Sequence, residues 1–140
     1  MLIDTNILIE IPKKQQNHRD CLNLLKAIKN ELIQEKVFFT RFALHALEAI
    51  VSKFDPQFLK KILLMIHQEK ITVFDTSIAD DLMILSSMGD LGFDFDDATQ
   101  YVATNRIGTY IVTFDKGFKD KGIEVKTPKE ILESIIKNYR

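Results

Sequence analysis

Residues 1–6, MLIDTN, place an apolar run directly before a carboxylate. A short apolar run of this kind, bounded by a polar residue, is typical of a buried β-strand. In open sheets of parallel strands, ligands bind in the crevice at the carboxyl ends of the strands. We therefore predict that Asp4 ends the first strand and that its side chain faces such a crevice.

Along the rest of the chain, short apolar runs alternate with longer segments of helical periodicity. The runs predict strands at 1–4, 37–40, 71–74 and 109–113, with an edge strand at 122–125. The periodic segments predict helices at 16–35, 42–53, 56–69, 77–88 and 96–107, and a last helix that opens at 127–130. This alternation favours a three-layer α/β/α sandwich with a mostly parallel sheet of four or five strands. The length suits a single domain over residues 1–140.

Composition excludes several classes of protein. Hydrophobic residues make up 46% and charged residues 28%, as in ordinary globular domains. No apolar run approaches the ~20 residues of a membrane span, and the chain opens without an export signal, so we expect a cytoplasmic protein. Cys21 is the only cysteine, which suits a reducing compartment. A net charge of −1 argues against a passive nucleic-acid binder more than against a metal-dependent nuclease.

Five acidic residues are candidates for one shared site. Asp4 and Asp115 each follow a predicted strand, so both are expected at the same edge of the sheet. Asp96 and Asp97 open a predicted helix, and Glu48 lies among apolar neighbours in another. Carboxylates that share a cleft repel one another unless they hold protons or cations. Because the three histidines are scattered and there is one cysteine, an all-oxygen site for Mg²⁺ or Mn²⁺ is the metal site to expect.

Each of these acids also has a purely structural interpretation. Any aspartate in 94–97 suits the cap of a helix, and Asp115 suits a turn after a strand. Glu48 suits the solvent edge of its helix. Asp80 and Asp81 are predicted to be solvent-exposed acids in the first turn of their helix.

Three motifs together resemble the PIN-domain superfamily, and within it the VapC-like toxin ribonucleases: LIDTN at 2–6, FDDATQY at 95–101 and IVTFDKGF at 111–118. Their order and spacing fit over essentially the whole chain. The resemblance implies a PIN-like fold and a four-acid endoribonuclease site that binds Mg²⁺ or Mn²⁺. It implies that Asp4, Asp97 and Asp115 are catalytic metal ligands, that Glu48 is the remaining catalytic acid, and that Asn6, Thr113, His45 and Asp96 support them.

The same resemblance implies an RNA substrate, a small antitoxin protein that blocks the cleft, and a homodimer. The apolar helices at 42–53 and 56–69 offer a dimer face, although core packing explains them equally well. Two positions depart from the family pattern. Glu48 lies eight residues after Thr40, farther than the usual second acid, and Gly117 stands where many relatives carry another acid. These departures leave a second interpretation open, a catalytically weakened PIN-like module that binds RNA or protein.

Two other enzyme classes also begin with an acid at the end of a strand. Phosphatases with an aspartate nucleophile need a second aspartate two residues later as general acid, and this chain has Asn6 there. A phosphorylated receiver domain would use Asp75 as acceptor with Lys116 nearby.

For a nuclease, unpaired RNA suits a narrow acidic cleft. The candidate basic contacts at its rim are Lys13, Lys14, Lys53, Arg106, Lys116 and Lys119.

Overall fold

Five parallel strands form the centre of the computed structural model, which describes residues 1–138. The last two residues of the predicted domain, 139 and 140, lie outside the described part. The strand order is β3-β2-β1-β4-β5, and each neighbouring pair is parallel. The strands are β1 (Leu2–Ile3), β2 (Phe38–Thr40), β3 (Thr72–Phe74), β4 (Ile111–Val112) and β5 (Val125–Lys126). The predicted parallel sheet is therefore confirmed, with five strands.

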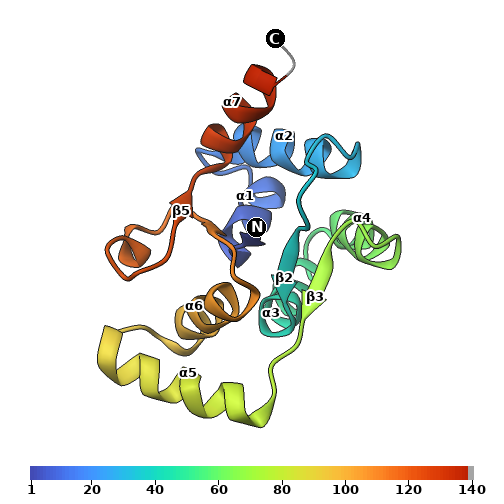
Figure 1. Ribbon diagram of the computed structural model, residues 1–140. Helices are drawn as coiled ribbons and strands as arrows, with labels where there is room; N and C mark the ends of the chain where they lie inside the picture. The colour runs from blue at the N-terminus through green and yellow to red at the C-terminus, as the bar shows by residue number, and fades with distance from the viewer. Residues whose placement is uncertain (139–140) are drawn as a thin grey trace.

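Helices cover both faces of this sheet (Figure 1). They are α1 (Thr5–Lys13), α2 (His18–Lys29), α3 (Arg41–Val51), α4 (Pro56–His67), α5 (Ile78–Leu91), α6 (Phe95–Ile107) and α7 (Pro128–Asn138), with a 3₁₀ turn η1 (Lys116–Phe118). No helix within residues 1–138 combines the length and apolar character needed to span a bilayer.

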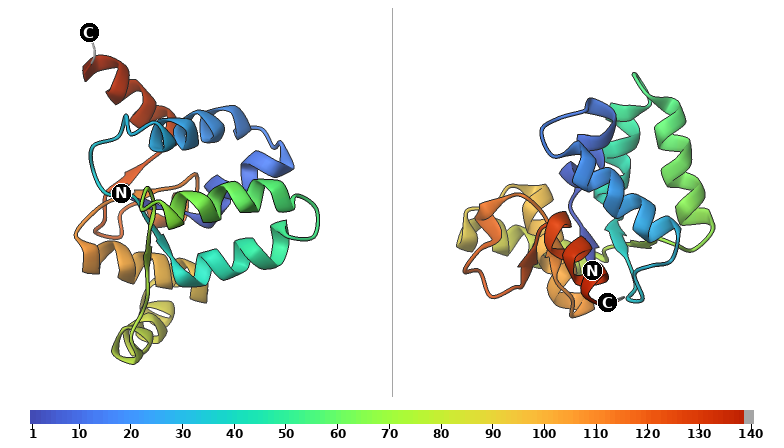
Figure 2. Two further views of the ribbon diagram at one scale, coloured as in Figure 1. Left: turned by 90° about the vertical axis from the view of Figure 1, so that its right-hand side faces the viewer. Right: turned by 90° about the horizontal axis from the view of Figure 1, so that it is seen from above.

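Two separate apolar clusters show why the layers form. Successive side chains of a strand point to opposite faces of a sheet. Accordingly, Ile3 packs in a cluster with residues of α1 to α4, whereas Leu2 packs in another with residues of α5 and α6. Figure 2 shows the same division, with α5 at the outer margin of the molecule in both views. Because β1 is buried on both faces, its side chains must all be apolar, as Leu2 and Ile3 are.

Two helices differ from the sequence prediction. The sequence pattern assigns no element to the residues after Asp4, but Thr5–Lys13 forms α1 directly at the end of β1. Pro12 lies in the last turn of this helix, and a proline there argues against a helix in the sequence pattern. The C-cap residue, Lys14, has the left-handed conformation. The helix predicted at 16–35 is shorter, because Glu31 has a positive φ of 57° that interrupts it. Leu32 and Ile33, which continue the apolar spacing after this break, lie in the loop that follows α2.

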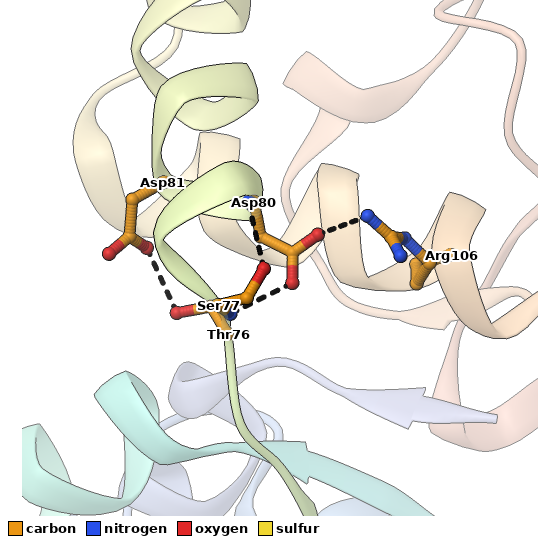
Figure 3. A network of polar contacts seen from close by, with 5 residues as sticks. All are labelled: Thr76, Ser77, Asp80, Asp81 and Arg106. Atoms are coloured by element: carbon orange, nitrogen blue, oxygen red, sulfur yellow. Dashed lines mark hydrogen bonds and ion pairs between the residues drawn. The ribbon is translucent and has the colours of Figure 1, made fainter.

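A polar network joins α5 to α6 (Figure 3). Ser77 caps α5: its hydroxyl accepts from the backbone N–H of Asp80 at 3.1 Å, and Asp80 accepts from the backbone N–H of Ser77 at 2.9 Å. Arg106 of α6 pairs with the same carboxylate. The prediction that Asp80 is solvent-exposed was therefore wrong, because Asp80 is buried and pairs with Arg106. The backbone N–H of Ser77 is the main cause that lowers the pKa of Asp80.

Candidate active site

The carboxyl ends of β1 and β4 bring two polar residues side by side. Ile3 and Val112 are partners in the parallel pairing, so the next residues, Asp4 and Thr113, lie together at the edge of the sheet. The hydroxyl of Thr113 donates to Oδ2 of Asp4 at 2.6 Å and accepts from the backbone N–H of Asp115 at 2.9 Å. A single buried hydroxyl therefore connects the first acid to the segment that carries Asp115.

Asp4 is an almost fully buried carboxylate, with 3% of its surface exposed. Its Oδ1 accepts from the backbone N–H of Asn6 at 3.3 Å and from Nε2 of Gln100 at 3.2 Å. Burial raises the pKa of Asp4, and the negative charge of Asp115 raises it further, while the hydrogen bonds from Thr113, Asn6 and Gln100 oppose that rise. The three hydrogen bonds thus offset part of the cost of burying a carboxylate at this position.

Gln100 is a site residue that the sequence analysis did not single out. Its side chain is fully buried in α6, and its amide nitrogen donates to both Asp4 and Asp96, at 3.2 and 3.1 Å. Its carbonyl Oε1 has no hydrogen-bond partner within residues 1–138. Its spacing from Asp96 could have indicated this role, because Gln100 lies four residues, or one helical turn, after Asp96 and shares a face of the helix with it.

The amino end of α6 concentrates negative charge. Asp94 is the cap, since its carboxylate accepts from the backbone N–H of Asp97 at 2.8 Å. Asp96 and Asp97 therefore do not serve as caps. Burial, followed by the charges of Asp94, Asp115, Asp4 and Asp96, raises the pKa of Asp97 to about 7. Burial also raises the pKa of Asp96, against the hydrogen bond from Gln100. Acids from three separate segments thus influence one another's ionisation.

Asp115 combines a turn role with a place in this cluster. Its Oδ1 accepts from the backbone N–H of Gly117 at 2.8 Å, which caps η1. A Cβ at Gly117 would lie 3.0 Å from that same oxygen, so a larger residue would press on the carboxylate. Lys116 and Lys119 line a small pocket together with Asp115. Of the predicted rim cations, these two thus lie near Asp115, whereas Arg106 is engaged by Asp80.

The structure does not bring Glu48 and His45 to the cluster. His45 Nδ1 lies 3.1 Å from Glu48 Oε1, and both side chains line a groove between α3 and β3. Phe42 marks the side of α3 that faces α6, because its ring centre lies 5.3 Å from that of Phe95. Glu48 follows Phe42 by six residues, or about 240° around the helix, and so points elsewhere. This position matches the solvent-edge interpretation of Glu48.

Comparison with known proteins identifies the family. A model of the PIN domain matches residues 1–124 of the chain. The chain belongs to the PIN domain family. No curated protein sequence matches this PIN domain.

Several solved structures share the fold of this PIN domain. VapC20 of Mycobacterium tuberculosis, a toxin that cleaves the sarcin–ricin loop, has a TM-score of 0.71 and 12% identity, covering 88% of this chain and 95% of that chain. A toxin–antitoxin complex from Klebsiella pneumoniae has a TM-score of 0.69 and 16% identity, covering 91% and 96%. VapBC2 from Rickettsia felis, bound to a promoter DNA fragment, has a TM-score of 0.63 and 17% identity, covering 90% and 96%. These likenesses confirm the predicted PIN-like fold.

The receiver-domain alternative does not fit this PIN domain. Asp75 follows the edge strand β3, is exposed, and lies 3.8 Å from Arg41. Lys116 follows β4, which is three strands away in the sheet. With strands about 4.8 Å apart, that order separates the two residues by roughly 14 Å. The structure therefore keeps the proposed phosphate acceptor and its lysine apart.

The donor set of this PIN domain fits a hard divalent cation by its chemistry. Asp4, Asp96, Asp97 and Asp115 offer only oxygen atoms, the ligands that Mg²⁺ and Mn²⁺ prefer. Throughout residues 1–138, no three His, Cys, Asp or Glu side chains already converge as a preformed metal site. Like charges that raise one another's pKa keep such side chains apart, and a cation removes that repulsion.

Proposed function

We propose that this PIN domain is a metal-dependent endoribonuclease that hydrolyses phosphodiester bonds in RNA, as the toxin of a type II toxin–antitoxin pair. The observation that carries the proposal is geometric: the amide of Gln100 joins Asp4 to Asp96, and the hydroxyl of Thr113 joins Asp4 to the segment of Asp115. Burial, followed by the charges of the neighbouring aspartates, accordingly raises the pKa of Asp97 to about 7. Such a concentration of charge is costly unless a proton or cation offsets it. Strongly perturbed acids of this kind cluster at functional sites.

In this proposal Asp4, Asp97 and Asp115 hold Mg²⁺ or Mn²⁺, with Asp96 beside them. A divalent cation supplies Lewis-acid chemistry, which activates water for attack and offsets charge on the phosphate oxygens. The protein's own contribution is orientation, since Thr113 and Gln100 fix the carboxylate of Asp4 by direct hydrogen bonds.

The proposed substrate is single-stranded or looped RNA, because unpaired nucleotides can enter a narrow cleft and present their phosphates to it. Lys116 and Lys119 lie beside Asp115 and are placed to meet neighbouring phosphates.

Cleavage of an unstructured RNA tests the proposal directly. We expect products when Mg²⁺ or Mn²⁺ is added to the metal-free protein, and none after the metal is chelated with EDTA, because the acids alone cannot activate water. The control is Asp90→Asn, which neutralises an exposed acid of α5 and should cleave like the wild type. Metal-independent cleavage, or equal residual cleavage by a variant lacking both Asp4 and Asp97, would contradict the proposal.

A second function, the catalytically weakened module that binds RNA or protein, is favoured by one observation. Glu48 is the sole acid of α3, and its side chain lies with His45 instead of Asp4. Calorimetric titration discriminates the two functions. Heat of binding at millimolar Mg²⁺ or Mn²⁺ supports the nuclease, whereas RNA binding without metal binding or cleavage supports the weakened module.

We also propose two protein partners, a small antitoxin and a second copy of the chain. The antitoxin is suggested by solved toxin–antitoxin complexes with the same fold.

For the homodimer, α5 offers a better face than α3 and α4, the two helices that the sequence suggested as a dimer face. Its inner face contacts α6 through the buried Ile84, and its outer face exposes large apolar residues at helical spacing: Ile78, Leu82 and Leu85.

Substitution of Leu82 tests the dimer. Leu82 is 65% exposed at the centre of this outer face, and burial of a leucine contributes about 1.5–3 kcal/mol. We therefore expect Leu82→Glu to convert a dimer into a monomer, as measured by light scattering after gel filtration. Ile136→Glu on α7, at 55% exposure, is the matched control and should remain dimeric. A monomeric wild type, or a dimeric Leu82→Glu protein, would count against this face.

A further inference from the structure

A pair of aromatic rings, one exposed and one half-buried, stands next to the acid cluster. Phe42 lies in the first turn of α3, just after the carboxyl end of β2, and 44% of its surface is exposed. Phe95 is the first residue of α6 and directly precedes Asp96 and Asp97. The two ring centres lie 5.3 Å apart, with their planes inclined at 58°. This contact bridges the two helices at the edge of the sheet where Asp4 ends β1.

The two helices present opposite chemistry at this contact. Residues spaced by four and seven along a helix share a face, so Ala46 and Ala49 lie on the same side of α3 as Phe42. Phe42 and the two alanines make that side of α3 largely apolar, with His45 at its edge, while Glu48 points elsewhere. The amino end of α6 opposite carries Asp94, Asp96 and Asp97 within the first turn and cap. A nucleotide has this same division, with a flat apolar base and a charged phosphate.

We propose that Phe42, backed by Phe95, is a stacking subsite for an unpaired nucleobase next to the phosphodiester that the acids receive. This inference rests on the proposed ribonuclease function and adds to it the residues that bind the base. Aromatic side chains recognise unpaired bases by stacking, and any of the four bases can occupy such a site. Arg41, adjacent in sequence and exposed, adds a positive charge to the same turn of α3, and its 3.8 Å pairing with Asp75 is a weak surface contact.

The surroundings favour a nucleobase over a protein as the occupant. A stable protein interface covers about 800 Å² on each partner, far more than two rings provide. A protein surface seated on Phe95 would also bury the neighbouring Asp96 and Asp97, and both acids resist losing water. A phosphate with its accompanying cation removes that cost, and the attached base is then within reach of Phe42.

Equilibrium binding tests the subsite separately from catalysis. The full chain carrying Asp97→Asn, which impairs cleavage, is titrated into a fluorescein-labelled unstructured RNA in Mn²⁺, and fluorescence anisotropy reports the Kd. We expect Phe42→Ala in this background to weaken binding roughly 5- to 100-fold, the range measured for loss of one stacked base. Phe42→Tyr keeps a stacking ring and should retain the affinity. The matched control is Phe54→Ala, because Phe54 is equally exposed at 48% but lies beyond the far end of α3.

A second RNA series locates the base. In oligonucleotides with a single abasic site, one position should lose as much affinity as Phe42→Ala, and combining the two changes should add little further loss. Unchanged binding by Phe42→Ala, or equal losses at Phe42 and Phe54, would overturn the subsite while wild-type cleavage leaves the nuclease standing. Absence of both RNA binding and wild-type cleavage would overturn the two proposals together. If Phe42→Ala impaired only the association of the chain with a protein partner, the surface would be assigned to that partner and the stacking role rejected.

Discussion

Asp4→Asn is expected to reduce RNA cleavage by roughly 10³-fold or more and, at the same time, to stabilise the metal-free protein. Asp4 is the most buried of the clustered acids and accepts three hydrogen bonds, so its position is fixed. An amide cannot supply the negative charge that a divalent cation and the reacting phosphate require, which explains the loss of activity.

The fold should tolerate this substitution because the amide can satisfy most of the same partners. Its oxygen can take the place of Oδ1 and accept from Gln100 and the backbone N–H of Asn6. Its nitrogen then takes the place of Oδ2 and can donate to the second lone pair of the Thr113 hydroxyl, whose own hydrogen loses its acceptor. The cost is therefore one hydrogen bond from a buried hydroxyl group.

The gain in stability follows from the raised pKa of Asp4. A carboxyl group whose folded pKa lies above its unfolded value favours unfolding once the pH exceeds the unfolded pKa, because only the folded state pays to ionise it. Asparagine removes that penalty at pH 8. Thermal unfolding in EDTA should therefore show a higher Tm for Asp4→Asn than for the wild type, with Asp90→Asn as the control. Wild-type cleavage by Asp4→Asn would exclude Asp4 from the reaction, and a lower Tm would show that the hydrogen bond lost from Thr113 costs more than the charge penalty.

Local signals in the sequence were sufficient for the sheet and for part of the site. Asp4 and Asp115 could be placed because each comes at the end of a short apolar strand, and parallel strands end at one edge. Helix boundaries were less accessible, since the break at Glu31 depends on backbone conformation and not on apolar spacing. The helix after Asp4 was missed because Pro12 interrupts an otherwise apolar segment.

Side-chain direction required the structure. Glu48 lies in a helix as predicted, but the rotation of α3 is set by the packing of Leu44, Leu47 and Val51 into the core, and this turns Glu48 away from Asp4. Asp80 was misjudged because its partner, Arg106, lies on another helix. Such long-range pairings leave no periodic signal in the chain.

The apparent affinity of the protein for Mn²⁺ is expected to increase steeply as the pH rises through 7. The pKa of Asp97 is about 7, so below that pH a cation must displace a proton from this carboxyl group. Displacement of one proton changes the apparent affinity about tenfold per pH unit. Asp4 and Asp96, whose pKa values are also raised, add to the dependence in the same direction.

Calorimetry in buffers of different ionisation enthalpy counts the protons released on binding. We expect about one proton at pH 6 from the group at Asp97 and almost none at pH 8.5. Asp97→Asn should bind Mn²⁺ more weakly at high pH and lose this step in proton release, whereas Asp90→Asn should keep it. A pH-independent affinity in the wild type would show that Asp97 is not a ligand.

The same group gives an independent readout without any metal. The ordinary pKa of an aspartate is 3.8, so between pH 4 and 7 the folded protein holds a proton on Asp97 that the unfolded chain has released. The metal-free protein should therefore lose stability as the pH rises through this range, by an amount on the order of 1 kcal/mol once partial exposure is allowed for. Asp97→Asn should flatten that part of the profile of Tm against pH. A profile unchanged by the substitution would mean that the clustered charges do not act on Asp97, and the electrostatic argument for a cation at this site would fail with it.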